Sequence, residues 1–146
     1  MKFPYTALPF DGLTILRPLL KVTIRNGDIA CSIWALVDTG ADHCACSAEI
    51  GESIGLDVKS VVPRKSVQID GTVLDVYFHR ILLEIKGISL LSECGFIYGM
   101  DNMVLGHRGF LEHFRATFFY SENWFALKPI SKSIWPKIWR KIFPSS

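Results

Sequence analysis

The positions of apolar and polar residues predict a chain built mostly from short β-strands. Residues 13–25 are predicted as one strand, because apolar and polar side chains alternate clearly from Leu20 to Arg25. Asn26-Gly27-Asp28 then gives a strong signal for a hairpin turn. The return strand, residues 29–37, is apolar on both faces, so we expect it to lie centrally in a sheet.

The same pattern recurs downstream, with turn residues between the runs. Residues 66–78 alternate around Asp70-Gly71, which is a second hairpin signal. Short helices are expected at 47–55, where Ser47 suits the N-cap and Gly55 the stop, and at 109–114. Further short strands are predicted at 81–85, 88–91, 96–100, 103–106, 115–120 and 124–127. Many short strands with one or two short helices indicate an all-β barrel or sandwich.

The last residues differ from this pattern, which divides the chain into a domain at 1–130 and a tail at 131–146. Apolar residues of the tail fall in pairs, at 134, 135, 138, 139, 142 and 143, with Lys and Arg in the gaps. Pro136 is tolerable only in the first turn of a helix. This basic amphipathic segment either packs on the barrel or a partner subunit, or contacts a membrane surface or an anionic partner.

Composition narrows the class of protein. A chain of 146 residues suits one domain, and no apolar run approaches the roughly 20 residues of a membrane span. The net charge of +2 excludes a strongly electropositive nucleic-acid binder, so we expect no nucleic-acid partner. The N-terminus lacks the apolar core of a signal peptide, and the four cysteines lack the spacing of a disulfide scaffold. We therefore expect a cytoplasmic protein with reduced thiols.

The run that carries chemistry is Ala35-Leu36-Val37-Asp38-Thr39-Gly40-Ala41-Asp42. An apolar strand delivers Asp38 to its C-terminal end, a hydroxyl follows at Thr39, and Gly40 lets the chain turn sharply. Further along, Met103-Val104-Leu105-Gly106 is an apolar run that ends in glycine, and a short helix and two strands come after it.

This order of motifs resembles the retropepsin-like aspartic proteases, the single-domain cellular and bacterial relatives of the retroviral proteases. The resemblance covers roughly residues 18–127. It implies a closed retropepsin-like (acid protease) barrel with one lobe per chain, and a homodimer of two such chains. It also implies an aspartic endopeptidase that hydrolyses peptide bonds of a peptide or protein substrate, without a metal or a cofactor.

The chemistry of peptide hydrolysis explains why one chain is insufficient. One group must deprotonate water while another polarises the carbonyl, and two carboxylates in contact do both because they cannot both ionise easily. This chain has one Asp-Thr-Gly, at Asp38, so the second carboxylate has to come from a second copy. A two-fold axis between two Asp38 side chains satisfies that requirement.

By the same resemblance, the residues around Asp38 have separate tasks. Thr39 braces the opposite loop across the two-fold axis, and the Gly40 N–H approaches the Asp38 carboxylate. Ala41 and Asp42 contact the substrate, and Asp42 also pairs with a basic residue. Retroviral members place an arginine after the downstream glycine, where this chain has a histidine, so the basic partner of Asp42 is open.

Two further segments complete the site that the resemblance implies. Leu105 and Gly106 pass beneath Asp38 and belong to the substrate-binding set. A flap, residues 67–73, is expected to close over an extended peptide that adds to it as a strand. Its substrate-binding tip is Ile69, Asp70, Gly71 and Thr72.

Other interpretations are weighed beside this one. The same barrel can serve as a non-catalytic module that binds a peptide or a partner, and the tail can make the protein a membrane-surface adaptor. His43, Cys44 and Cys46 match a zinc site poorly, and nothing marks a base for a cysteine protease. Six aromatic residues are expected in the core rather than at a cofactor: Trp34, Phe96, Phe110, Phe114, Phe118 and Phe119.

Overall fold

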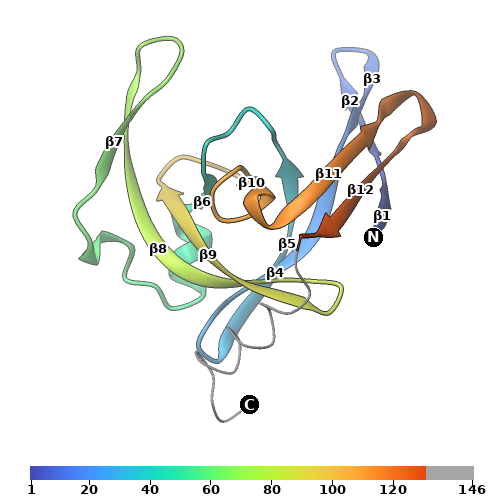
Figure 1. The fold of residues 1–146 in the computed structure, drawn as a ribbon. Coiled ribbons are helices and arrows are strands. Elements are labelled where there is room, and N and C mark those ends of the chain that lie inside the picture. The colour runs from blue at the N-terminus through green and yellow to red at the C-terminus, as the bar shows by residue number, and fades with distance from the viewer. Residues whose placement is uncertain (131–146) are drawn as a thin grey trace.

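Six strands close into a barrel, as Figure 1 shows. In their order of pairing they are β4 (Leu19–Asn26), β5 (Ile29–Val37), β10 (Met103–Leu105), β6 (Cys44–Ser47), β9 (Ile88–Ile97) and β8 (Val73–Ile85). Pairing of β8 with β4 completes the closure, and β7 (Arg64–Val67) adds to β8 at one side. This computed structural model describes residues 1–130, so the tail predicted at 131–146 lies outside the described residues.

Two smaller sheets flank the barrel. One is the terminal sheet, in which β12 (Trp124–Pro129) lies between β1 (Lys2–Pro4) and β11 (Phe114–Phe119). The other is a two-stranded ribbon of β2 (Thr6–Phe10) and β3 (Leu13–Arg17). The helical elements are short: α1 (Ala48–Ser53) and the 3-10 turns η1 (Val58–Ser60), η2 (Leu111–His113) and η3 (Tyr120–Glu122). In residues 1–130 no helix has the length and apolar character that crossing a membrane requires.

Alternation along β4 builds the interior of the barrel, as the sequence predicted. Leu20, Val22 and Ile24 are buried, whereas the intervening Lys21 is exposed. The predicted hairpin at 26–28 is also confirmed, because Asn26 pairs directly with Ile29 across the turn. The closed barrel decides between the two all-β architectures that the sequence allowed.

The single strand predicted at 13–25 is wrong, because the chain divides it at Pro18. Proline has no N–H for a ladder, and the Pro18 carbonyl instead accepts the Val37 N–H at 2.9 Å. Residues before Pro18 turn away from the barrel and pair with β2, a strand that the sequence pattern did not predict. Downstream the opposite error occurred: the predicted segments at 88–91 and 96–100 are one strand, β9, up to Ile97.

The core prediction is correct for some of the aromatic residues and wrong for others. Phe96, Phe110 and Phe114 are buried, but Trp34 is 58% exposed. Trp34 lies in β5, and Ile29 at the start of the same strand is also exposed. Pairing at the centre of a sheet therefore did not bring burial on both faces. Phe118 is also partly exposed at the surface.

Helix α1 packs closely against the barrel, near the boundaries that the sequence predicted. A Cβ added to Gly51 would lie 2.6 Å from Cδ1 of Phe96, so only glycine allows this approach. The helix is followed by Gly55 at φ +84°, a left-handed conformation suited to a helix stop. The helix therefore holds the chain that follows β6 against β9.

Candidate active site

The sheet itself holds Asp38 in place. β5 and β10 are parallel neighbours, with Val37 directly opposite Leu105. The Asp38 N–H donates to the Leu105 carbonyl at 3.0 Å, which extends this pairing by one residue. The Asp38 side chain is half-buried, at the point where the chain leaves the barrel. The backbone of the candidate catalytic residue is thus fixed by a central pair of strands.

The loop after β5 orients the Asp38 carboxylate. The Gly40 N–H donates to Asp38 Oδ1 at 2.8 Å, the contact that the family resemblance implies. A Cβ at Gly40 would lie 3.2 Å from that same oxygen, which is tight, so glycine suits this approach. The Ala41 N–H donates to the Asp38 carbonyl at 3.3 Å and completes the turn. One carboxylate oxygen is therefore committed to the backbone of its own loop.

Gly106 lies directly beneath this loop. A Cβ added at Gly106 would meet the His43 carbonyl oxygen at 2.3 Å and the Ala41 carbonyl oxygen at 2.6 Å. The next two residues tie the segments together, because the His107 N–H donates to the Ala41 carbonyl at 2.9 Å. The Arg108 N–H donates to the Asp42 carbonyl, also at 2.9 Å. The two motifs singled out from the sequence therefore meet in space.

Two polar side chains beside Asp38, those of Thr39 and Asp42, have no partner within residues 1–130. His107 Nε2 donates to the Thr39 carbonyl oxygen at 2.6 Å, so the histidine braces the loop through its backbone. Within residues 1–130 the exposed Thr39 hydroxyl forms no hydrogen bond, and the exposed Asp42 carboxylate forms no ion pair. The basic partner predicted for Asp42 is therefore not found inside the described part of one chain.

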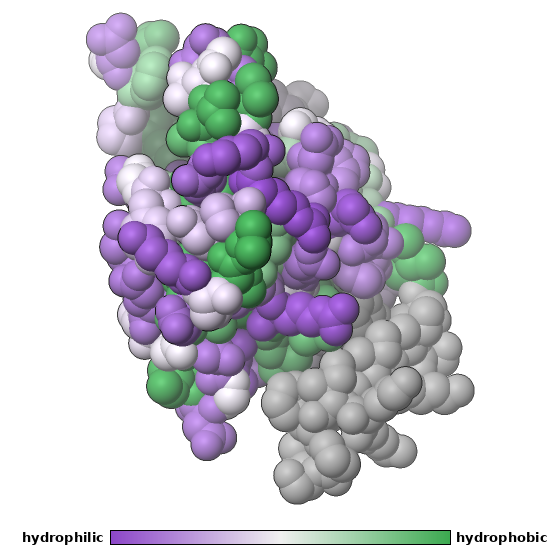
Figure 2. Space-filling view, turned by 90° about the vertical axis from the view of Figure 1, so that its left-hand side faces the viewer, coloured by the Kyte–Doolittle hydropathy of each residue, from purple (hydrophilic) through white to green (hydrophobic). Residues whose placement is uncertain are grey.

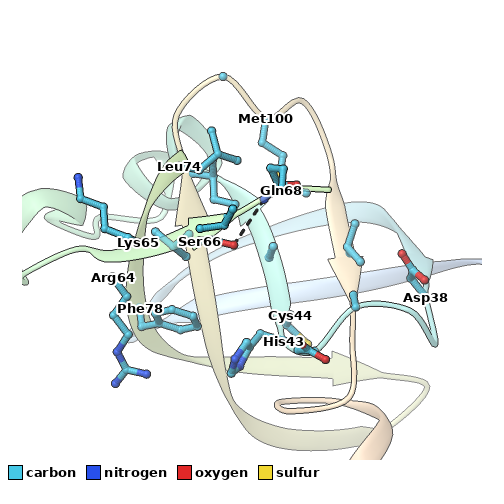
Figure 3. A pocket seen from close by; sticks show the side chains of 18 of the residues that line it. Asp38, His43, Cys44, Arg64, Lys65, Ser66, Gln68, Leu74, Phe78 and Met100 are labelled. Carbon is cyan, nitrogen blue, oxygen red and sulfur yellow. Dashed lines mark hydrogen bonds between the residues drawn. The ribbon is translucent and has the colours of Figure 1, made fainter. Parts of the chain in front are cut away.

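A cleft of about 1020 Å³ opens beside Asp38 (Figure 3). The Asp38 loop forms one side and the β7–β8 hairpin the other. Of the predicted site residues, the lining includes Asp38, Gly40, Ala41, Asp42 and Ile69. Thr39, Asp70, Gly71, Thr72, Leu105 and Gly106 do not line it. Leu105 is buried below the loop, so its part is to support Asp38.

The segment predicted to be the flap is a hairpin tip held by hydrogen bonds. The Gly71 N–H donates to the Gln68 carbonyl at 2.9 Å, and the Gln68 N–H donates to the Thr72 carbonyl at 2.8 Å. Asp70 Oδ1 accepts the Thr72 N–H at 2.9 Å, and this hydrogen bond lowers the pKa of Asp70. Ile69 is fully exposed at the tip. Figure 2 shows this side of the molecule, where hydrophobic patches lie among hydrophilic residues.

Several lining residues were missed by sequence reasoning. The Arg64 guanidinium lies 4.9 Å from the centre of the Phe78 ring. The His43 ring contacts the Phe78 ring edge-on, with the two ring centres 5.2 Å apart. Lys65 pairs with Asp75 on the same hairpin. Further lining side chains are Ser66, Gln68, Leu74, Val76, Ile97, Tyr98, Met100 and Val104. Alternation along the hairpin strands was the available signal, but which face meets the cleft depends on how the barrel closes.

The cysteines near this site are unsuited to nucleophilic chemistry. Burial raises the pKa of Cys44 to about 11 and that of Cys46 to about 12. Burial also raises the pKa of Cys94 well above its ordinary value. All three thiols are therefore protonated near neutral pH, and the thiolate is the reactive form. This argues against the cysteine-protease interpretation.

Comparisons with known proteins identify the fold. No family model matches the sequence, and no curated protein matches it. Among solved structures, the chain is similar to the crystal structure of a retropepsin-like aspartic protease from Rickettsia conorii, with a TM-score of 0.56 and 16% identity. The match covers 87% of this chain and 90% of that one. This chain therefore has the retropepsin-like fold, a closed all-β barrel with one lobe per chain.

Proposed function

We propose that the protein is an aspartic endopeptidase that acts as a symmetric homodimer, with Asp38 of each chain forming the catalytic dyad. The observation that carries the proposal is the position of the Asp38 carboxylate. It is oriented by the Gly40 N–H at 2.8 Å, and it lines a cleft whose other side is the β7–β8 hairpin. The Rickettsia conorii protein with the same fold is described as an aspartic protease, which supports this assignment.

A second copy supplies what one chain lacks. In one chain, the Asp38 carboxylate has no second carboxylate of an Asp-Thr-Gly motif to share a proton with. The Thr39 hydroxyl and the Asp42 carboxylate also have no side-chain partner within residues 1–130. A two-fold axis beside Asp38 brings all three groups close to their counterparts. We assign the bracing contact to Thr39 and an ion pair with the second chain to Asp42.

In the proposed mechanism the two Asp38 carboxyls share one proton, because like charges in contact cannot both ionise easily. The ionised carboxylate takes a proton from water as the water oxygen attacks the peptide carbonyl carbon. The protonated carboxyl donates its proton to the carbonyl oxygen, which gives a neutral tetrahedral diol. The ionised carboxylate then takes a proton from one hydroxyl of the diol, and the protonated carboxyl donates its proton to the nitrogen as the C–N bond breaks, which releases the acid and the amine.

The substrate is an extended peptide, held between the Asp38 loop and the flap. An extended chain can pair with hairpin backbone as an added strand, while its side chains enter pockets on alternate sides. Val67 and Ile69 are exposed at the flap, so closure over a peptide would bury apolar surface there. The lining side chains Leu74, Val76 and Val104 provide apolar contact deeper in the cleft.

The test is digestion of a peptide library by the full chain and by Asp38→Asn. Because Asn cannot serve as the base, cleavage should fall by on the order of 10²–10⁴-fold, with an unchanged thermal transition. Asp11→Asn is the matched control, since Asp11 is an exposed turn residue that does not line the cleft. An active-site inhibitor of aspartic proteases should abolish cleavage by the wild type. Undiminished, inhibitor-resistant cleavage by Asp38→Asn would end the proposal.

The alternative is a non-catalytic module that binds a peptide or a partner in the same cleft. A crystal structure of the dimer distinguishes the enzyme from the binding module, because the enzyme requires the two Asp38 carboxylates at hydrogen-bonding distance. Separated carboxylates or monomeric chains would favour the module. A cytoplasmic location is part of our proposal, and it is supported by free thiols at Cys31, Cys44, Cys46 and Cys94.

A further inference from the structure

The terminal sheet has an outer face whose composition differs from its inner one. In β12, Phe125 and Leu127 are fully buried and face the core. Because side chains alternate along a strand, Trp124 and Lys128 lie on the outer face. This outer face points away from the core that residues 1–130 form.

The register carries basic residues from all three strands onto this outer face. Arg115 of β11 lies opposite Lys128, and Lys2 of β1 lies opposite Ala126. Phe119 lies opposite Trp124, and their rings stack with centroids 4.0 Å apart. We define the basic terminal face as Lys2, Arg115, Phe119, Trp124 and Lys128.

The positive charge of this face is not balanced within the described residues. Lys2, Arg115 and Lys128 are exposed, and in residues 1–130 none of them forms an ion pair. The Lys2 ammonium lies 4.1 Å from the centre of the Trp124 ring. The neighbouring acidic residue is Glu122, in the turn at one end of the sheet, where it accepts the Trp124 indole N–H at 2.8 Å.

The sequence that follows β12 is also basic and rich in apolar and aromatic residues. From residue 123 to residue 146 the chain has five Lys or Arg and no Asp or Glu. The tail adds Ile, Trp and Phe in pairs, at positions 134, 135, 138, 139, 142 and 143. It leaves the domain next to Ile130, which is 58% exposed at the end of the sheet. The face and the tail are therefore contiguous, basic and rich in aromatic residues.

We propose that the basic terminal face and residues 131–146 together bind the surface of an anionic lipid bilayer. Lys and Arg near such a surface attract its anionic headgroups. Tryptophan rings are amphipathic and favour the level of the headgroups, while Ile and Phe enter the acyl boundary. Neither the charges alone nor the apolar residues alone would give stable binding, but this surface combines both.

Two observations favour a lipid surface over a nucleic acid. The apolar residues of the tail suit a bilayer boundary, whereas a phosphate backbone would leave most of them in water. The chain as a whole has a net charge of only +2, whereas strong binding to a nucleic acid usually needs a large positive excess.

The arrangement in the fold also suits this role. Figure 1 shows the terminal sheet on the opposite side of the barrel from β7 and the flap. Docking through the sheet therefore leaves the cleft beside Asp38 open to a substrate. A bilayer-bound protease would meet its substrates near the membrane, but the binding itself does not depend on catalysis.

The experiment is flotation of the full chain with phosphatidylcholine vesicles, with and without phosphatidylserine. We expect binding only to the vesicles that contain phosphatidylserine, and weaker binding as salt is raised. The triple variant Lys2→Ala/Arg115→Ala/Lys128→Ala should bind on the order of tenfold to a hundredfold more weakly. A full chain with Lys132, Lys137, Arg140 and Lys141 each changed to Ala should lose at least as much.

The matched control is Lys21→Ala/Lys59→Ala/Arg80→Ala, which removes the same charge from exposed positions elsewhere. It should bind like the wild type. Equal binding to both kinds of vesicle, no loss in the first triple variant, or equal loss in the control would each overturn the proposal. Binding to a single-stranded oligonucleotide but not to vesicles would overturn it as well. If the first triple variant fails to fold, the tail variant and the salt series decide.

The membrane-binding proposal and the protease proposal can be tested independently of each other. Asp38→Asn should bind anionic vesicles as well as the wild type, because Asp38 is not part of the basic terminal face. Loss of cleavage with intact vesicle binding, or the reverse, would therefore identify which of the two is wrong.

Discussion

Gly106 shows how a single residue decides the geometry of this site. The loop that carries Asp38 passes very close to Gly106. A Cβ at Gly106 would meet two carbonyl oxygens of this loop, that of His43 at 2.3 Å and that of Ala41 at 2.6 Å. Backbone atoms cannot move aside as the end of a flexible side chain can. The glycine therefore sets how near the downstream strand comes to the Asp38 loop, and this proximity lets the Leu105 carbonyl accept the Asp38 N–H.

The buried cysteines support a prediction about pH at the same scale. The pKa of Cys44 is raised from 9.0 to about 11 by burial, so between these values the unfolded chain loses a proton that the folded chain keeps. Stability should therefore fall as pH rises from about 9 to about 11. Urea denaturation across this range checks the sign, and a Cys44→Ala/Cys46→Ala variant should show a smaller decline. A free energy of unfolding that does not change between pH about 9 and about 11 would contradict the raised pKa of Cys44.

Alkylation provides an independent measurement of the same burial. Near neutral pH the folded chain should react with iodoacetamide at Cys31, which is only partly buried, and far more slowly at Cys44, Cys46 and Cys94. Mass spectrometry after digestion locates the modified residues. All four should react in urea, so rapid modification of the buried three in the folded chain would argue against the core described here.

At the scale of elements, the turn of the proposed flap contains a side-chain hydrogen bond. The carboxylate of Asp70 accepts the Thr72 N–H, and the lowered pKa means that this bond persists until pH falls below the ordinary range of an aspartate. Its stabilisation of the turn is present at higher pH and is lost as pH falls through the lowered pKa. The flap turn should therefore loosen only in strong acid.

The corresponding prediction compares Asp70→Ala with Asp70→Asn. Hydrogen exchange of the Thr72 amide should speed up in Asp70→Ala, because the acceptor is removed. Asp70→Asn keeps a side-chain carbonyl at the same place and should retain most of the protection. Equal exchange in the wild type and Asp70→Ala would show that the turn is held by its backbone bonds alone.

At the scale of the whole molecule, the proposed dyad of two Asp38 side chains predicts how mixtures of wild type and variant behave. If each active site needs Asp38 from both chains, a mixed dimer of wild type and Asp38→Asn is inactive. Adding an equal amount of the variant, with exchange of subunits, should then lower the activity to about half. Asp11→Asn, added likewise, should not lower it. Unchanged activity with the Asp38 variant would mean that one chain suffices, and sedimentation analysis would show whether dimers form.

Local signals in the sequence were sufficient for the parts of the site that lie on short stretches of chain. The hairpin at Asn26-Gly27-Asp28, the strand leading to Asp38 and the glycine at 106 each depend on neighbouring residues or on backbone conformation. Such features can be predicted because turn chemistry and alternation act within a few residues. Pro18 is an exception among these local signals. A proline disfavours a continuous strand, yet one strand was predicted across it, and the structure has two strands, β3 and β4, on either side.

The cleft wall and the basic terminal face were not predictable in that way. Arg64 and Phe78 reach the cleft because β7 pairs with β8 and β8 curves across the barrel. Lys2 and Arg115 share a face because β12 lies between strands from opposite ends of the chain. The hairpin of β7 and β8 is itself local, but the face that it turns to the cleft depends on the pairing of β8 with the distant β4, and β1 pairs with β12 from the other end of the chain.

The sequence by itself therefore determined the motifs on which the proposed chemistry rests: one Asp-Thr-Gly after an apolar strand, a downstream apolar-apolar-Gly, and a hairpin between them. The tertiary structure decided what surrounds that chemistry. Closure of β8 onto β4 and the register of the terminal strands chose which side chains face the cleft, the core or the solvent. The reason is that turns and strands follow from local conformation, whereas the choice of face follows from burying apolar surface between distant segments.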